Sequence, residues 1–118
     1  VCLVTSNPSS NTDLTTADYD YNKFGTVSQA PDLDLGSATL DAYNDWVLNA
    51  TGLGNINKTG ITKFGCRLHS DRDNVAPTWS SYDDSTYGCH FADGTNKPKL
   101  VVTYTPAVAG YSHGFIFG

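Results

Sequence analysis

The residues best suited to chemistry lie in a polar stretch that spans positions 68–79. Asp71, Asp73 and Asn74 match the start of the D-x-[DN] pattern of a calcium-binding loop. That pattern also requires a glycine after the acidic residues and a distal glutamate, and the chain contains no glutamate. The calcium-loop interpretation therefore fails.

The same aspartates allow two other interpretations. A looser cation site would draw its carboxylates from four residues, which are Asp71, Asp73, Asp83 and Asp84. An ion pair from Arg67 or Arg72 to one of these aspartates would instead stiffen the loop. We expect the ion pair and no metal site.

The chain lacks the residue patterns of the common catalytic sites. Glycoside hydrolysis uses two carboxylates of different pKa, usually including a glutamate, and there is none. His69, His90 and His113 are present, but none accompanies a G-x-S-x-G motif or a cysteine-protease signature. There is also no glycine-rich phosphate loop. We expect neither an enzyme nor a cofactor.

The three cysteines have two interpretations. Cys66 and Cys89 share the parity of the inward-facing residues of their predicted strands. They are then buried thiols, which behave as small hydrophobic residues, or they form a disulfide between neighbouring strands that leaves Cys2 over. No two cysteines have the C-x-x-C spacing of a zinc site.

Three aromatic residues, Trp79, Tyr82 and Tyr87, lie beside or just after the polar stretch. Flat aromatic rings can stack on the apolar face of a sugar, so these residues are the candidates for a carbohydrate site. The alternative is that they cover the edge of the domain.

Two segments, Asn49-Ala50-Thr51 and Asn57-Lys58-Thr59, match the N-glycosylation pattern. Such matches also arise by chance in a chain rich in asparagine and threonine. The sequence leaves the use of both sites open.

Charge and hydropathy exclude two classes of partner. The net charge is −5 and the seven Lys and Arg residues are scattered, whereas nucleic-acid binding needs a clustered basic surface. An acidic surface repels anionic lipid, and no apolar run approaches the roughly 20 residues of a membrane helix. We expect no nucleic acid and no membrane among the partners.

Short alternating segments must position these residues. The central strand is predicted over residues 61–68, with Thr62, Phe64, Cys66 and Leu68 on one face and Ile61, Lys63, Gly65 and Arg67 on the other. Further strands are predicted over residues 1–6, 24–28, 42–49, 87–91 and 100–104.

Single helical turns are predicted at Thr15–Tyr19, capped by a threonine hydroxyl and pinned by Leu14, and at residues 51–56. Frequent Gly, Pro, Ser, Thr, Asn and Asp residues indicate many turns. The predicted fold is all-β, an antiparallel jelly-roll-like β-sandwich with one or two single-turn helices.

The predicted sandwich domain spans residues 1–106, and residues 107–118 form a tail or an added strand. Exposed Tyr111, Phe115, Ile116 and Phe117 would promote aggregation, so we expect the tail to fold back or to dock on another subunit. The chain opens directly with strand-forming residues, Val1 and Leu3 among them, and we interpret this start as the edge of a longer polypeptide whose strand can also pair between subunits.

Residues 1–106 resemble the C-terminal portion of the DNRLRE-type β-sandwich domains. The segments that carry the resemblance are LTTADYD, DAYNDWVLNATGL, ITKFGCRL, a D-x-D-N-x-x-P-x-W loop and KPKLVVTYT. Similar sequences occur in environmental bacterial and phage proteins. The resemblance implies a jelly-roll-like module used outside the cell for structure, adhesion or carbohydrate binding, with upstream strands that this sequence lacks.

The sequence therefore predicts a non-catalytic extracellular structural subunit. Its partners would be copies of itself, joined into a filament or virion appendage partly by strand addition. The alternative is a carbohydrate-binding or adhesive module of a larger surface protein. We expect a location outside the cell, on the cell surface or in a virion.

Overall fold

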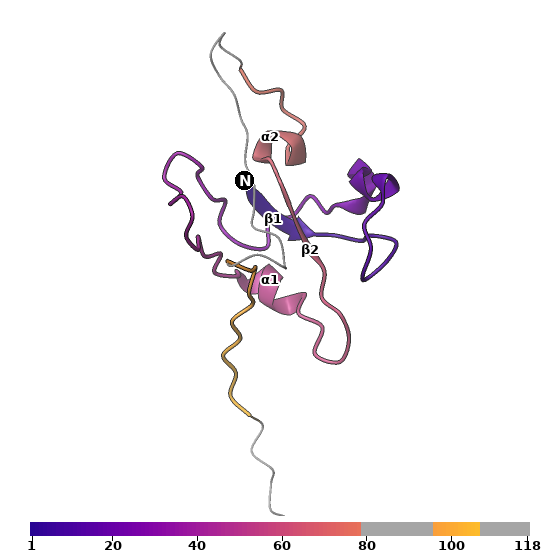
Figure 1. Ribbon diagram of the computed structural model, residues 1–118, viewed down its shortest axis with the longest axis vertical. Helices are drawn as coiled ribbons and strands as arrows, with labels where there is room; N and C mark the ends of the chain where they lie inside the picture. Colours follow the sequence, from indigo (N-terminus) through magenta and orange to yellow (C-terminus); the bar gives the residue numbers. More distant parts are fainter. Residues whose placement is uncertain (79–95, 107–118) are drawn as a thin grey trace, which may run out of the picture.

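The computed structural model describes residues 1–78 and 96–106. Along the chain it contains β1 (Cys2–Thr5), η1 (Thr16–Tyr19), η2 (Tyr21–Lys23), α1 (Ala50–Gly54), β2 (Phe64–Arg67) and α2 (His69–Arg72). These short elements surround the crossing point of the two strands, and the orange segment, residues 96–106, leads away from the body at its lower end (Figure 1). No helix in the described ranges is long and apolar enough to cross a membrane.

The predicted β-sandwich is wrong. Within the described residues there is one sheet, the antiparallel pair of β1 and β2, in which Cys2 lies opposite Arg67 and Thr5 opposite Phe64. Most of the other described residues lie in irregular structure. Two of the predicted strands, over residues 1–6 and 61–68, are confirmed in shortened form as β1 and β2.

The other predicted strands form no ladder. The segment 24–28 contributes a single bridge, between Ser6 and Phe24. Segments 42–49 and 100–104 pair with no strand in the described part of the chain. The strand predicted over residues 87–91 lies outside the described residues.

Within the described residues, the backbone groups on the second edge of β1 explain why no strand is added to the sheet on that side. The carbonyl oxygens of Val1, Leu3 and Thr5 accept hydrogen bonds from the backbone amides of Leu33, Gln29 and Gly25, at 2.7, 2.8 and 2.9 Å. These donors belong to residues 25–33, an irregular segment that covers β1 and forms no strand. The edge of β1 is therefore satisfied within the chain, as buried backbone groups must be, without extending the sheet.

The core is small and partly polar. Among the described residues, the buried hydrophobic ones are Val1, Cys2, Val4 and Ala30. Gln29 is 1% exposed, and its side chain donates to Val27 O at 2.7 Å and accepts from Asn55 Nδ2 at 2.7 Å. Gln29 therefore joins the end of α1 to the segment that covers β1.

The two faces of β2 are the reverse of the prediction at Cys66 and Arg67. Cys66 is exposed, whereas Arg67 is buried. The register explains this, because directly opposed residues project to the same face, and Arg67 lies opposite the fully buried Cys2. Gly65 lies opposite Val4 and leaves room for the Phe24 ring, whose Cε1 is 2.6 Å from the position of a Cβ at Gly65.

Both predicted helical turns are confirmed. η1 follows Thr15, whose backbone amide and hydroxyl donate to Asp18 Oδ2 at 2.9 and 3.1 Å, so the carboxylate provides the cap that was predicted for the threonine hydroxyl. Leu14 does not pin the turn, because it is 72% exposed. α1 begins after Asn49, whose Oδ1 accepts from Gly52 N at 2.9 Å as an N-cap.

Candidate functional site

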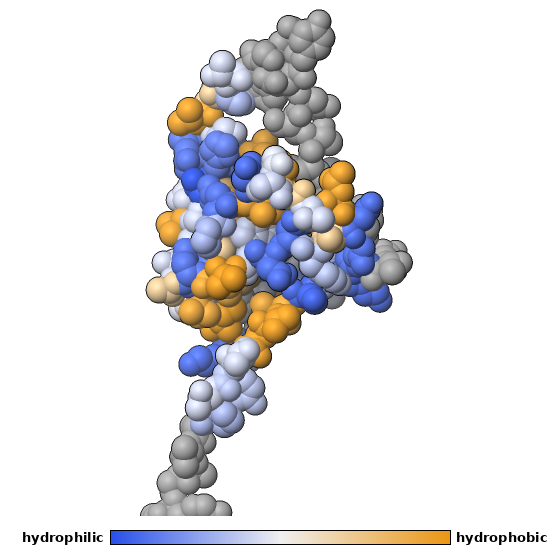
Figure 2. Space-filling model, turned by 90° about the vertical axis from the view of Figure 1, so that its left-hand side faces the viewer, coloured by the Kyte–Doolittle hydropathy of each residue, from blue (hydrophilic) through white to orange (hydrophobic). Residues whose placement is uncertain are grey.

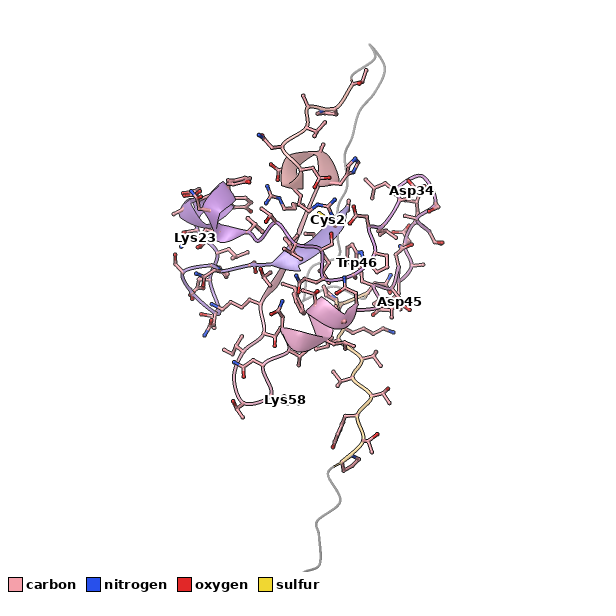
Figure 3. All side chains as sticks on the ribbon, turned by 180° about the vertical axis from the view of Figure 1, so that it is seen from behind. Cys2, Lys23, Asp34, Asp45, Trp46 and Lys58 are labelled. Carbon is pink, nitrogen blue, oxygen red and sulfur yellow. The ribbon has the colours of Figure 1, made fainter. Side chains whose placement is uncertain are left out.

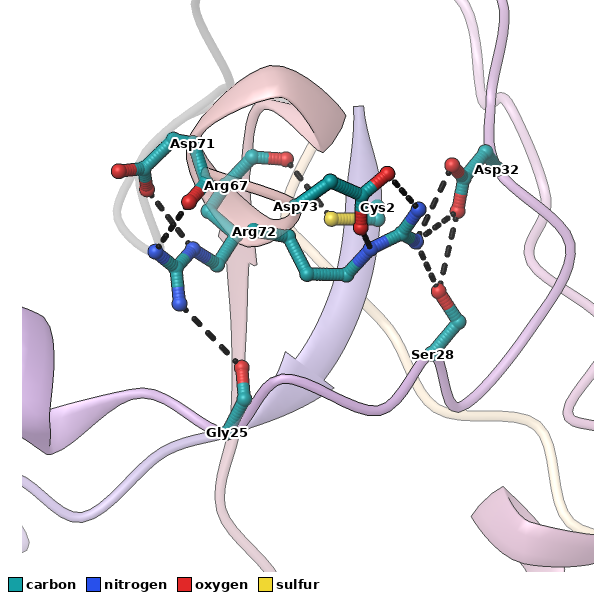
Figure 4. A network of polar contacts seen from close by, with 8 residues as sticks. All are labelled: Cys2, Gly25, Ser28, Asp32, Arg67, Asp71, Arg72 and Asp73. Carbon is teal, nitrogen blue, oxygen red and sulfur yellow. Dashed lines mark hydrogen bonds and ion pairs between the residues drawn. The ribbon is translucent and has the colours of Figure 1, made fainter. Parts of the chain in front are cut away.

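The polar stretch that the sequence singles out forms one helical turn beside the sheet. β2 ends at Arg67, α2 follows at once, and the amide of Asp73 closes the turn on His69 O at 2.8 Å. This arrangement brings two arginines and three aspartates from separate segments into one network (Figure 4).

Arg67 is the buried charge of this network, with 5% of its surface exposed. Its Nε donates to Asp71 Oδ2 at 2.7 Å, and its Nη2 donates to the Asp71 carbonyl oxygen at 3.0 Å. Its Nη1 donates to Gly25 O at 3.4 Å, and the guanidinium carbon lies 4.8 Å from the centroid of the Tyr21 ring. Arg67 therefore joins β2 to α2 and to residues 21–25.

Arg72 binds two carboxylates. Its Nε and Nη2 donate to the two oxygens of Asp73, at 2.7 and 3.0 Å, in the fork geometry that suits a guanidinium. Its Nη1 donates to both oxygens of Asp32, at 2.9 and 3.2 Å, and to Ser28 Oγ. These contacts lower the pKa of Asp73 and raise the pKa of Arg72, because each charged form is hydrogen-bonded by its partner.

Cys2 lies beneath the two arginines. Its Sγ donates to the carbonyl oxygen of Arg67 at 3.2 Å, and the side chain is fully buried. Burial raises the pKa of the Cys2 thiol, against the opposing effect of Arg72. A protonated buried thiol is a poor nucleophile, so Cys2 serves as a core residue.

The network is therefore built as a structural clamp. Arg72 holds the Asp73 carboxylate in its charged form. Asp73 is therefore poorly suited to donate a proton. In residues 1–78 and 96–106 no group of three or more His, Cys or Asp side chains could hold a metal ion. The predicted ion pair from Arg67 or Arg72 to a loop aspartate is confirmed, and both arginines form one, Arg67 with Asp71 and Arg72 with Asp73.

Sequence reasoning missed Ser28 and Asp32. They lie 44 and 40 residues before Arg72, and they carry no local pattern that points to it. The available signal was indirect. A half-buried arginine such as Arg72 needs several acceptors, and one neighbouring aspartate cannot supply them all.

A cleft of about 440 Å³ lies on another side of the sheet. Phe24, Ile61 and Phe64 supply its apolar lining, and hydroxyl and amide groups of residues 6–12 supply its polar lining. The charges balance, because Lys23 and Lys63 face the cleft together with Asp13 and Asp18. Its volume falls within the range of small-molecule sites in proteins.

Comparisons of the chain with family models, with curated proteins and with solved structures found no match. The resemblance to the DNRLRE-type domains therefore stays a hypothesis that rests on the residues that suggested it.

Several predicted site residues lie outside the described residues. They are the sugar-stacking candidates Trp79, Tyr82 and Tyr87, the tail residues Tyr111, Phe115, Ile116 and Phe117, and Cys89, the predicted partner of Cys66. Of the residues predicted to mediate assembly, Val1 is 6% exposed and Leu3 is half-buried. The amino group of Val1 donates to Leu33 O at 2.8 Å, so this end of β1 is packed against its own chain.

Proposed function

We propose that this chain is a non-catalytic extracellular structural subunit that assembles with copies of itself into a filament or virion appendage, partly by strand addition. The observation that carries the proposal is the exposure of the apolar side chains of residues 100–104. This segment has the alternating β-forming sequence Leu-Val-Val-Thr-Tyr, and its large apolar residues are exposed on both faces.

The exposure of this segment is extensive. Leu100, Val101, Val102 and Tyr104 are 64, 77, 59 and 76% exposed. Figure 2 shows hydrophobic surface gathered at the lower end of the body, where residues 96–106 leave it. Monomeric soluble proteins rarely leave such contiguous apolar surface uncovered, which supports a covering partner.

The base of the segment is fixed to the body. Tyr43 Oη donates to Lys97 O at 3.0 Å, and Asn96 Nδ2 donates to Asp41 O at 3.2 Å. Lys99 Nζ lies 4.0 Å from the centroid of the Tyr43 ring. A strand held at its base and uncovered beyond it is suited to adding to a neighbouring subunit.

The neighbouring segment also packs incompletely. Residues 42–49 alternate in burial as predicted, with Trp46 and Leu48 half-buried and Val47 78% exposed. The Trp46 Nε1 is buried, and no described residue accepts a hydrogen bond from it. Native interiors rarely leave such a donor unsatisfied, so the packing around Trp46 is incomplete within the described residues.

β1 is not the strand that we propose to add. One of its edges pairs with β2, and the carbonyl oxygens along the other bond to residues 25–33. We therefore assign strand addition to residues 99–105. Pro98 and Pro106, which cannot donate to a ladder, mark the limits of this strand.

Antiparallel pairing of two such strands about Val102 would satisfy both copies. Val102 then lies opposite its own copy, and Leu100 lies opposite Tyr104 on the same face, an aliphatic and aromatic cross-strand pair. The opposite face carries Val101 and Thr103. Burying one such side chain stabilises by about 1.5–3 kcal/mol and association costs about 4–15 kcal/mol, so the six inward residues of the two copies together can offset a cost of this size.

The test compares one charge placed on either face of the strand. We expect the wild type to sediment as an oligomer larger than a dimer and Val102→Asp to sediment as a smaller species, because pairing about Val102 would bury two carboxylates against each other. Thr103→Asp carries the same charge on the opposite face and should stay oligomeric. A wild type that sediments as a monodisperse monomer, or two variants that behave alike, would contradict the proposal.

The alternative function, a carbohydrate-binding or adhesive module, is favoured by the cleft beside Phe24 and Phe64. Its test is a glycan array with the wild type and with Phe64→Ala, which removes apolar lining from the cleft. Trp79→Ala tests the aromatic residues that the sequence suggested. A blank array for the wild type removes this alternative and leaves the assembly proposal untouched.

A further inference from the structure

The two N-glycosylation motifs have different environments in the folded chain. Both asparagines are exposed, so exposure alone does not separate them. What separates them is the use of each side-chain amide. Transfer of a glycan needs a free amide nitrogen on the asparagine and a hydroxyl two residues later.

Asn49 uses both ends of its side-chain amide within the fold. Its Oδ1 accepts from Gly52 N at 2.9 Å as the cap of α1, and its Nδ2 donates to Ser28 O at 3.0 Å. Its backbone amide also donates to Gln29 O at 2.9 Å. A glycan on Nδ2 would have to fit between α1 and the segment that covers β1.

Asn57 uses only the oxygen of its side-chain amide. Its Oδ1 accepts from Thr59 N at 3.0 Å and, at the longer distance of 3.4 Å, from Thr59 Oγ1. Its Nδ2 donates to no acceptor within residues 1–78 and 96–106. The amide oxygen is thereby fixed toward the threonine of the motif, and the nitrogen is the open end.

The surroundings of Asn57 are open as well. Lys58 lies at the tip of a loop that projects away from the sheet (Figure 3), and residues 57–61 are all exposed. Gly60 borders the amide, since a Cβ there would be 2.7 Å from Asn57 Nδ2. A glycine at this position keeps that side of the nitrogen clear.

We propose that Asn57 is an N-glycosylation site of this chain and that Asn49 is not. In the transfer, Asn57 Nδ2 forms a bond to the anomeric carbon of a sugar carried on a lipid diphosphate. The bond between that carbon and the phosphate oxygen breaks, the diphosphate leaves with the electron pair, and Nδ2 gives up one proton to a base of the transferase. The inference does not depend on self-assembly.

The test is secretion of the full chain from a eukaryotic host that glycosylates, followed by peptide mass spectrometry. We expect the wild type to carry one glycan, at Asn57. Thr59→Ala removes the hydroxyl of that motif and should lose the glycan entirely. Thr51→Ala removes the hydroxyl of the other motif, keeps the Asn49 cap intact, and should carry the same glycan as the wild type.

Each other outcome would overturn the inference. A secreted wild type without a glycan shows that Asn57 is not used. A glycan at Asn49, alone or together with one at Asn57, shows that the cap does not protect it. Because Thr59 lies in an exposed turn, Thr59→Ala should be secreted, and Asn57→Gln provides a second variant that should lose the same glycan.

Discussion

At the scale of single residues, buried polar side chains hold the segments of this chain in place, a role that apolar side chains have in larger domains. The buried hydrophobic residues of the described chain are few, yet Asp18, Gln29 and Arg67 are each at most 5% exposed. Each of them makes at least one hydrogen bond within its own part of the chain and one to a more distant residue, which is Ser9 for Asp18, Asn55 for Gln29 and Gly25 for Arg67. Burying a polar group is tolerated only when it is hydrogen-bonded, so these three residues fix where their segments lie.

Asp18 should make the stability of the fold depend on pH in the acidic range. Hydrogen bonds from the backbone of Thr15 and Ser9 lower its pKa from 3.8 to about 2. A carboxylate whose pKa is lower in the folded state stabilises the fold fully above its unfolded pKa and loses this contribution as the pH falls through its folded pKa. We therefore expect the denaturant midpoint of the wild type to fall between about pH 4 and pH 2.

Asp18→Asn should have a lower midpoint near neutral pH and a smaller fall in acid. Both carboxylate oxygens accept from backbone amides, at 2.7 and 2.9 Å, so an amide group would place a donor against a donor. Asp13→Asn is the control, because Asp13 is exposed and accepts from the neighbouring Thr12 hydroxyl. Equal pH dependence in the Asp18 variant and the wild type would show that this carboxylate does not stabilise the fold.

Substitutions at Arg67 and Asp71 test the clamp at its buried residue and at its exposed residue. Arg67→Lys cannot serve Asp71 O and Gly25 O together, because lysine lacks the planar fork of donors. We expect a loss of about 1–3 kcal/mol in the free energy of unfolding, as for buried acceptors left without donors. Asp71→Asn keeps an oxygen acceptor for Arg67 Nε and should cost less than Arg67→Lys. Equal losses, measured by urea denaturation, would count against a buried clamp at Arg67.

At the scale of elements, the sequence predicted those helical turns and strands whose formation depends on residues close together in the chain. The turns η1 and α1 and the strand segments β1 and β2 were found, because capping side chains and short alternations are local signals. Segments 42–49 and 100–104 have the same alternation and form no ladder in the described chain. Alternation shows that a segment can be half-buried in a sheet, and it does not supply the partner strand.

The candidate site was likewise predictable only in the contacts between residues close together in the chain. The pairs Arg67–Asp71 and Arg72–Asp73 span four residues and one residue, and a pair of this local kind was expected from one of the two arginines. The contact of Arg72 with Asp32 spans 40 residues and was not. The burial of Arg67 and exposure of Cys66 depend on the register with β1, which the hydropathy of β2 alone cannot give.

α1 allows a matched test of its docking. A Cβ at Gly52 would collide with the carbonyl oxygen of Gln29 and lie 3.2 Å from Leu48 Cβ, whereas a Cβ at Gly54 would meet nothing within 4 Å. Neither glycine has a positive φ. Gly54→Ala should therefore stabilise the chain by about 0.5–1 kcal/mol through helix propensity, and Gly52→Ala should destabilise it by about 1–3 kcal/mol through overpacking.

Thermal denaturation followed by circular dichroism measures both variants. Opposite shifts of the midpoint support the packing of α1 on the segment that covers β1. Shifts of the same sign would mean that α1 does not dock there, because helix propensity would then be the sole effect of both substitutions.

At the scale of the whole molecule, the described chain leaves many large hydrophobic side chains exposed around a small core. Leu40, Val47 and Tyr104 are 89, 78 and 76% exposed, although a single exposed residue of this kind is ordinary. The exposed residues 100–104 are contiguous, which is what distinguishes them. If the chain associates as proposed, its apparent stability should rise with the logarithm of its concentration.

Deletion of Tyr111–Gly118 separates the two contacts that the proposed assembly would use. The deleted residues include Phe115, Ile116 and Phe117, which by sequence form an apolar segment suited to a contact between subunits. Pairing about Val102 is two-fold and closes on itself, so it yields dimers, and growth into a filament needs a second contact. If the tail supplies that contact, the truncated chain should sediment as a dimer and form no filaments in electron micrographs. Filaments that persist after the deletion would assign growth to other residues, and a truncated chain that sediments as a monomer would show that the pairing about Val102 depends on the tail.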